Sequence, residues 1–172
     1  MEATRSTLEG AQVPPSSWPL VVPFAAGLSI TYAVDRPHGY DYVQPGQLDS
    51  LGATPASLHE TAITTLAERA ATTMTVRGGG GRYVLEMPGD DDLAASLLLA
   101  PYLWASQIDV DGGVVAAVAT RVQVHLCGTD DTEAVAGLAD LALQLYDQGD
   151  GKPVTRDLLT WQDGTLQIYP SG

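Results

Sequence analysis

The sequence is short of basic residues and lacks long apolar runs. Eight Lys and Arg stand against 21 Asp and Glu, which gives a formal net charge of −13 over 172 residues. Nucleic acids and anionic membranes bind through clusters of cationic side chains, and here the basic residues are scattered. No apolar stretch approaches the ~18 residues of a spanning helix. We therefore expect neither a nucleic-acid partner nor a membrane partner.

Cysteine is almost absent as well. Cys127 is the single cysteine, which excludes an intrachain disulfide and a zinc site built on cysteine pairs. A protein of the reducing cytoplasm is the expectation that follows. The three histidines, His38, His59 and His125, fall in different segments, and no dinucleotide fingerprint or Gly-x-Ser-x-Gly elbow occurs. The sequence thus predicts no metal site and no cofactor.

What the sequence does contain is the composition of a globular protein, with 45% hydrophobic and 17% charged residues. Residues 1–15 have mixed charge and end at a Pro-Pro pair, which predicts a flexible N-terminal tail. Residues 16–172 are then expected to form a single α+β domain. Alternation of apolar and polar residues over 28–34 predicts a strand, and the segment 35–47 reads as a loop.

Three helices are predicted from apolar periodicity. The first covers 54–71, where Thr54 is an N-cap followed by proline. The second lies within 89–106, after three aspartates that complement a helix N-terminus, and Pro101 must kink or restart it. The third runs over 130–147, beginning with an aspartate and a glutamate at capping-box spacing.

Strands and hairpins outnumber single strands that alternate with helices. Strand-like runs cover 114–118 and 121–127, and Asp163-Gly164 predicts the turn of a C-terminal hairpin. The fold class predicted from this order is α+β, with a mostly antiparallel sheet and the three main helices packed on it.

Four consecutive glycines, Gly78–Gly81, stand between two arginines. A phosphate loop of the Walker type needs a lysine and a Ser or Thr leading into a helix, whereas here Arg82 leads into a strand-like run. Glycine tolerates the positive φ of hairpin turns, which favours a turn. The alternative is an anion site with Arg77 and Arg82 as clamps.

Two further groups of residues are candidates for function. Arg121, His125 and Cys127 share the polar face of a predicted strand, where a thiol and an imidazole two residues apart point the same way. A lone cysteine in a strand is also a common small core residue. Trp104 and Trp161 are candidates for an aromatic binding surface, whereas core packing is the default for Trp104.

A family resemblance extends over residues 28–169. The segments that carry it are "LDSLGATPASLHETAITTL", "GDDDLAASLLLAPYLW", "GGVVAAVATRVQV", "TDDTEAVAGLADLA" and "PVTRDLLTWQDGTLQIY". In order and spacing these segments resemble the bacterial YtpQ-like family, a domain of unknown function. Arg121 matches an arginine of that pattern, whereas Val122 and Thr65 stand where the family has aspartate and asparagine. The family has no established reaction, so the resemblance implies a fold and not an activity.

Two functions remain open from the sequence. The favoured hypothesis is a non-enzymatic binding or accessory protein, chaperone-like or immunity-like, that contacts a protein partner through an acidic or aromatic surface. The alternative is a small enzyme that uses the face containing Arg121, His125 and Cys127. A concave pocket that holds these three side chains favours the enzyme.

Overall fold

The computed structural model describes residues 14, 17–148 and 152–170. By its internal contacts the chain divides into two compact units, residues 1–62 and 63–172, each of which is described by itself. The predicted N-terminal tail, 1–15, lies outside the described residues except for Pro14.

The N-terminal unit contains two short antiparallel ribbons and a short helix. Its elements are β1 (Val21–Pro23), β2 (Ser29–Thr31), β3 (Ala33–Arg36), β4 (Gly39–Tyr42), η2 (Pro45–Gln47) and α2 (Leu48–Leu51). β1 pairs with β2, and β3 pairs with β4.

Two expectations for this unit need correction. The strand predicted over 28–34 is divided at Tyr32, whose buried hydroxyl lies 3.1 Å from Nδ1 of His59. The segment 35–47 is not all loop, because it contains β4, which an ion pair between Arg36 and Asp41 helps to hold against β3. The turn-forming residues of this segment predicted a loop, but such residues are equally typical of the ends of a hairpin.

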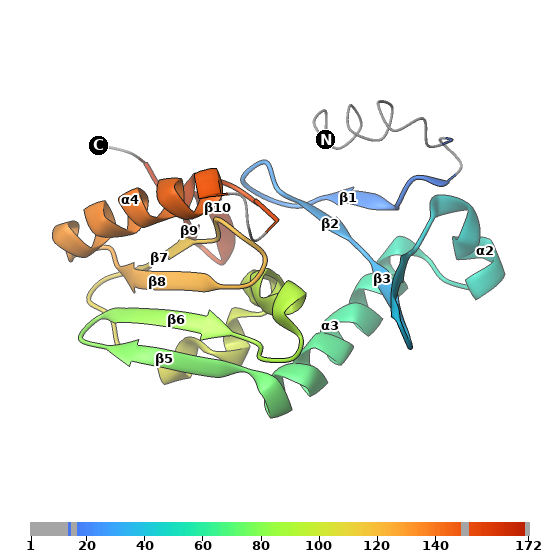
Figure 1. The fold of residues 1–172 in the computed structure, drawn as a ribbon, viewed down its shortest axis with the longest axis horizontal. Coiled ribbons are helices and arrows are strands. Elements are labelled where there is room, and N and C mark those ends of the chain that lie inside the picture. Colours follow the sequence, from blue (N-terminus) through green and yellow to red (C-terminus); the bar gives the residue numbers. More distant parts are fainter. Residues whose placement is uncertain (1–13, 15–16, 149–151, 171–172) are drawn as a thin grey trace. The chain divides into compact units, whose positions relative to one another are not determined.

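The C-terminal unit is built on a six-stranded antiparallel sheet (Figure 1). The strands are β5 (Thr75–Gly79), β6 (Arg82–Glu86), β7 (Val114–Ala117), β8 (Val124–Gly128), β9 (Leu158–Gln162) and β10 (Thr165–Ile168). They lie in the order β10-β9-β7-β8-β6-β5, and every neighbouring pair is antiparallel. The predicted class, α+β with a mostly antiparallel sheet, is confirmed.

Helix α3 (Pro55–Thr73) begins where the sequence predicts. The backbone N–H of Ser57 donates to Oγ1 of Thr54 at 3.1 Å, and the N–H of Thr54 donates to Oγ of Ser57 at 3.0 Å. This reciprocal pair satisfies two backbone N–H groups that have no partner within the helix.

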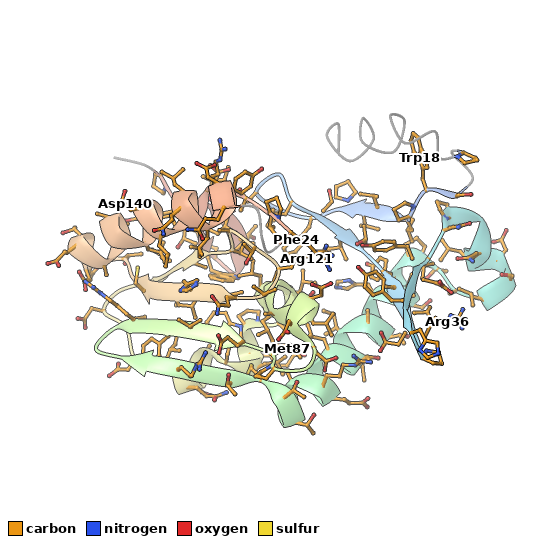
Figure 2. The ribbon with its side chains drawn as sticks, in the orientation of Figure 1. Trp18, Phe24, Arg36, Met87, Arg121 and Asp140 are labelled. Atoms are coloured by element: carbon orange, nitrogen blue, oxygen red, sulfur yellow. The ribbon has the colours of Figure 1, made fainter. Side chains whose placement is uncertain are left out.

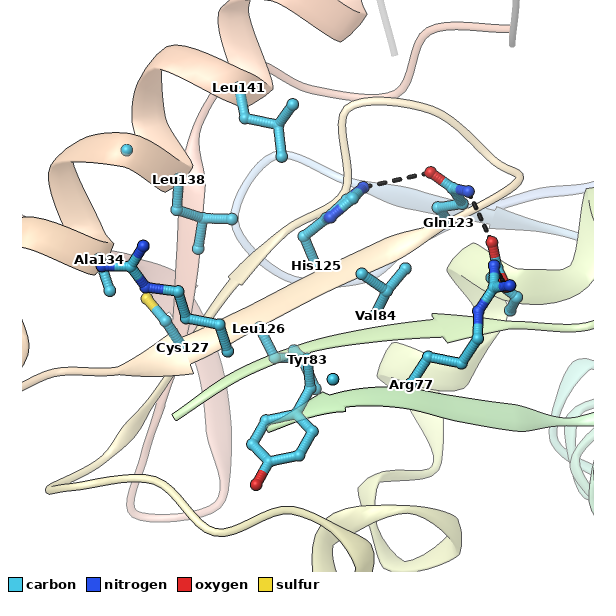
Figure 3. A pocket seen from close by; sticks show the side chains of 14 residues that line it. Arg77, Tyr83, Val84, Gln123, His125, Leu126, Cys127, Ala134, Leu138 and Leu141 are labelled. Atoms are coloured by element: carbon cyan, nitrogen blue, oxygen red, sulfur yellow. Dashed lines mark hydrogen bonds and ion pairs between the residues drawn. The ribbon is translucent and has the colours of Figure 1, made fainter. Parts of the chain in front are cut away.

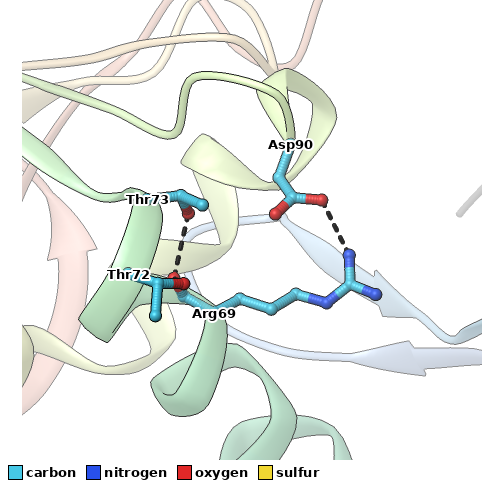
Figure 4. A network of polar contacts seen from close by, with 4 residues as sticks. All are labelled: Arg69, Thr72, Thr73 and Asp90. Carbon is cyan, nitrogen blue, oxygen red and sulfur yellow. Dashed lines mark hydrogen bonds and ion pairs between the residues drawn. The ribbon is translucent and has the colours of Figure 1, made fainter.

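The C-terminal end of α3 is tied to the loop before the next helical segment (Figure 4). Arg69 Nη1 lies 2.7 Å from Oδ1 of Asp90, and the hydroxyls of Thr72 and Thr73 donate to the carbonyl of Arg69. Asp90, expected to complement a helix N-terminus, therefore serves mainly as an ion-pair partner. Its side chain makes no cap hydrogen bond.

The predicted second helix is a series of 3₁₀ segments: η3 (Asp91–Leu99), η4 (Pro101–Leu103) and η5 (Ala105–Gln107). Pro101 begins a new 3₁₀ segment, as expected, because proline has no backbone N–H with which to continue the preceding one. η3 contacts β6 and β8, and it buries Leu97 and Leu98.

Helix α4 (Thr132–Gln148) packs against β8, β7 and β9, on the face of the sheet opposite to η3 (Figure 1). The N–H of Ala134 donates to Oδ1 of Asp131 at 2.8 Å. The N-cap is therefore Asp131, one residue after the predicted position. Both aspartates are suitable cap residues, and the sequence alone does not distinguish them.

The glycine run forms a hairpin turn, as predicted. Gly79 pairs with Arg82, which leaves Gly80 and Gly81 as a two-residue turn with φ values of 58° and 78°. Positive φ at both central residues is the geometry of a type I′ hairpin turn.

Replacement of Gly78 by alanine tests this hairpin. Gly78 has φ 129°, and an added Cβ would lie 2.1 Å from the carbonyl oxygen of Arg82. We expect Gly78→Ala to lower the free energy of unfolding by about 1–3 kcal/mol in urea denaturation. Gly137→Ala, at an exposed helical position with free space, is the control and should raise it by ~0.8 kcal/mol. A neutral Gly78→Ala contradicts the hairpin geometry.

Candidate functional site

Helix α4 covers only part of one sheet face. Val115 and Ala117 of β7 and Cys127 of β8 form a buried cluster with Ala134, Leu138 and Ala142 of α4. Directly paired residues point to the same face of a sheet, and Cys127 pairs with Arg82 while His125 pairs with Val84. The face under α4 therefore continues onto β6 and β5, which have no extensive contact with α4.

The uncovered half of this face forms an open groove of about 570 Å³ beside α4, which we call the α4 groove (Figure 3). Its floor includes Arg77, Arg82, Val84, Glu86, Gln123, His125 and Cys127, and its wall consists of the α4 residues Ala134, Gly137, Leu138 and Leu141. A site of this size, apolar on one side and polar on the other, has the character of a binding site.

A chain of polar contacts crosses the floor of the groove. Arg77 forms an ion pair with Oε2 of Glu86, and Oε1 of the same carboxylate accepts a hydrogen bond from Nε2 of Gln123 at 2.7 Å. The other side of the Gln123 amide lies 3.2 Å from Nε2 of His125 (Figure 3). The Glu86 side chain is only 14% exposed, so its two partners compensate for its removal from water.

Arg82 is placed at the opposite end of the groove. Its guanidinium lies 3.8 Å from Asp131 and 3.9 Å from Glu133, at the N-terminus of α4. Both arginines of the groove therefore face carboxylates. This pairing weakens the case for the anion site considered from the sequence, because a bound anion has to compete with those carboxylates.

His125 is partly buried in the groove floor. Burial lowers the pKa of its imidazole, and the carboxylate of Glu86 raises that pKa by a smaller amount. The net effect favours the neutral ring at neutral pH.

Cys127 lies at the base of the groove and is 2% exposed. Burial, and to a smaller extent the carboxylate of Asp131, raise the pKa of its thiol to about 11, against the opposing effect of Arg82. A nucleophilic cysteine needs the opposite shift. In this environment the thiol stays protonated and acts as a small apolar side chain.

The structure brings together four of the residues singled out from the sequence. Arg77, Arg82, His125 and Cys127 all line the α4 groove. Arg121 does not line it, because β8 begins only at Val124 and Arg121 lies in the connection from β7 (Figure 2). The carbonyl of Arg121 accepts a hydrogen bond from the N–H of Ala95.

Trp104 belongs to the buried core, and Trp161 is half-buried beside it. Trp104 is 1% exposed, and its Nε1–H donates to the carbonyl of Leu97 at 2.9 Å. Its ring packs edge-to-face on the half-buried Trp161, with 5.6 Å between ring centroids. The burial of Trp104 fits core packing, the default interpretation of this residue from the sequence.

Glu86, Gln123, Gly137 and Leu141 are groove residues that the sequence analysis did not single out. Strand alternation already places Glu86 on the same face as Arg82 and Val84. The pairing of β6 with β8 was the missing information, because sequence periodicity does not give the order of strands in a sheet.

Residues 14, 17–148 and 152–170 contain no group of three or more His, Cys, Asp or Glu placed to hold a metal ion. Within the same described part of the chain, no helix has both the length and the apolar character needed to cross a membrane.

Comparison with known proteins gives no match to a protein-family model, a curated protein or a solved structure. The resemblance to the YtpQ-like family therefore stays a prediction.

Thiol alkylation tests the state of Cys127. A pKa of about 11 in place of 9.0 reduces the thiolate fraction at neutral pH about 100-fold. Burial slows the reaction further. We expect iodoacetamide to modify the native protein at pH 7.5 at least about 100-fold more slowly than the urea-unfolded protein. Equal rates in the two states contradict this environment and restore Cys127 as a candidate nucleophile.

Proposed function

We propose that the protein is a non-enzymatic binding or accessory module that holds a basic amphipathic helix of a partner protein in the α4 groove. The observation that carries the proposal is the half-covered sheet face beside α4. Three properties of the groove support this occupant: its width, its apolar wall and the charge around it.

The width of the uncovered face suits one helix. β6 and β5 extend the sheet beyond β8. Two strands at ~4.8 Å spacing occupy about 10 Å, which is close to the diameter of a helix with its side chains. A partner helix beside α4 completes the layer that α4 begins.

The wall of the groove is apolar and leaves space for close approach. Leu138 and Leu141 line it, together with Gly137, which precedes both of them on α4. A Cβ added at Gly137 meets no heavy atom within 4 Å. The apolar face of an amphipathic helix fits such a wall, which is the helix-in-groove mode of recognition.

The charge of the protein favours a basic partner. The net charge is −13, and Glu133 and Asp140 are exposed on α4 on the same helix face as Gly137. Acidic side chains along the upper edge of the groove attract lysines or arginines on the polar side of a partner helix.

The enzyme alternative has less support. Arg121 does not line the groove, and the thiol of Cys127 is buried with a raised pKa. A cytoplasmic location is part of the proposal and fits a free, buried cysteine. A bacterial origin rests on the YtpQ-like resemblance alone.

Peptide binding tests the proposal. The probe is a fluorescently labelled helical peptide of lysine and leucine with an amphipathic pattern. A scrambled peptide of the same composition measures attraction by charge alone. We expect the amphipathic peptide to bind more tightly and to shift NMR signals of β5, β6, β8 and α4.

Two tryptophan substitutions on α4 locate the binding surface. Gly137→Trp places a large ring in the groove and should weaken binding of the amphipathic peptide at least about tenfold. Leu143→Trp is the matched control, because Leu143 is exposed and does not line the groove. Equal affinities of the two variants, or no preference over the scrambled peptide, refute the proposal.

A further inference from the structure

The polar chain in the groove floor has only one consistent arrangement of hydrogens. A carboxylate accepts hydrogen bonds and donates none. Glu86, paired with Arg77, therefore accepts from the amide of Gln123, and the atom of Gln123 that faces it is the NH₂ group. This leaves the carbonyl oxygen of Gln123 turned toward His125.

The orientation of Gln123 then determines the tautomer of His125. An amide oxygen only accepts, so Nε2 of His125, 3.2 Å away, has to carry the hydrogen. In the neutral ring the other nitrogen, Nδ1, keeps a free lone pair. No hydrogen bond of the described residues engages Nδ1 of His125, in contrast to Nδ1 of His59, which Tyr32 contacts.

The ring of His125 lies where a bound segment would pass. It projects from β8 toward Leu141 of α4, with Val84 below it on β6 (Figure 3). Apolar neighbours on two sides make an unpaired polar atom costly once water has been displaced.

We infer that the chain Arg77–Glu86–Gln123 holds His125 as a hydrogen-bond acceptor in the α4 groove, and that His125 selects partner segments that present an N–H or O–H donor to its Nδ1. The inference rests on the proposed function for the identity of the ligand. His125 is accordingly a specificity-determining residue, and Gln123 and Glu86 are positioning residues.

The first test uses the free protein and needs no partner. Two-bond ¹H–¹⁵N correlation of the histidine ring, at a pH where the ring is neutral, reports which nitrogen carries the hydrogen. We expect a protonated Nε2 and an unprotonated Nδ1. Gln123→Leu should give a mixture of tautomers, because Nε2 loses its acceptor. A protonated Nδ1 in the wild type, or an unchanged tautomer in Gln123→Leu, overturns the inference.

The second test uses binding of two lysine–leucine amphipathic peptides, identical except that one groove-facing leucine is replaced by glutamine in the first and by methionine in the second. Glutamine offers an N–H donor, whereas methionine offers none. We expect the wild type to prefer the glutamine peptide about tenfold when the replaced position meets His125, which a scan of the groove-facing positions identifies.

Variants of His125 distinguish the roles of its two ring nitrogens. In His125→Asn an oxygen occupies the place of Nδ1, so the preference for glutamine should persist. In His125→Leu both polar atoms are absent and the preference should disappear. No preference at any scanned position in the wild type, or preference that survives in His125→Leu, contradicts the selection. If neither peptide binds while the tautomer is as expected, the proposed function and the selection both fail, and only the assignment of the hydrogens stands.

Discussion

The packing of α4 on the sheet is the constraint on which the candidate site depends. Small side chains meet at this contact, among them Ala117, Ala134 and Ala142, so the helix sits close to β7 and β8. Helix α4 already lies over β8, β7 and β9, and a single helix is too narrow to cover β6 and β5 as well. Within the part of the chain that the structure describes, the groove lies where α4 leaves β6 and β5 of the six-stranded sheet uncovered.

Charged and polar side chains determine the hydrogen-bonding pattern in the floor of the α4 groove. Each charged group in the floor has a partner, and the contacts run in sequence from Arg77 through Glu86 and Gln123 to His125. A connected network of this kind is rigid, because a change at one member leaves its neighbour with an unpaired buried atom. Rigid polar groups beside an apolar wall suit recognition, whereas the protonated thiol of Cys127 offers no nucleophile.

Local signals predicted the elements better than their assembly. The Thr54 cap and the turn at Gly80 were predictable, because cap chemistry and positive φ depend on a few adjacent residues. Glu86 and His125 are 39 positions apart, and only the pairing of β6 with β8 places them on one face. Core packing was the default prediction for Trp104, which is buried, but a surface role stayed open because periodicity gives a face and not what covers it.

A thiol placed on each half of the sheet face shows whether β6 and β5 are open beside α4. In a Cys127→Ala background, Val84→Cys puts a thiol in the groove, and Val115→Cys puts one under α4. We expect rapid alkylation of the Val84→Cys protein and strong protection of the Val115→Cys protein under native conditions. Protection of both thiols would contradict this expectation, because the face would then be covered by the chain itself.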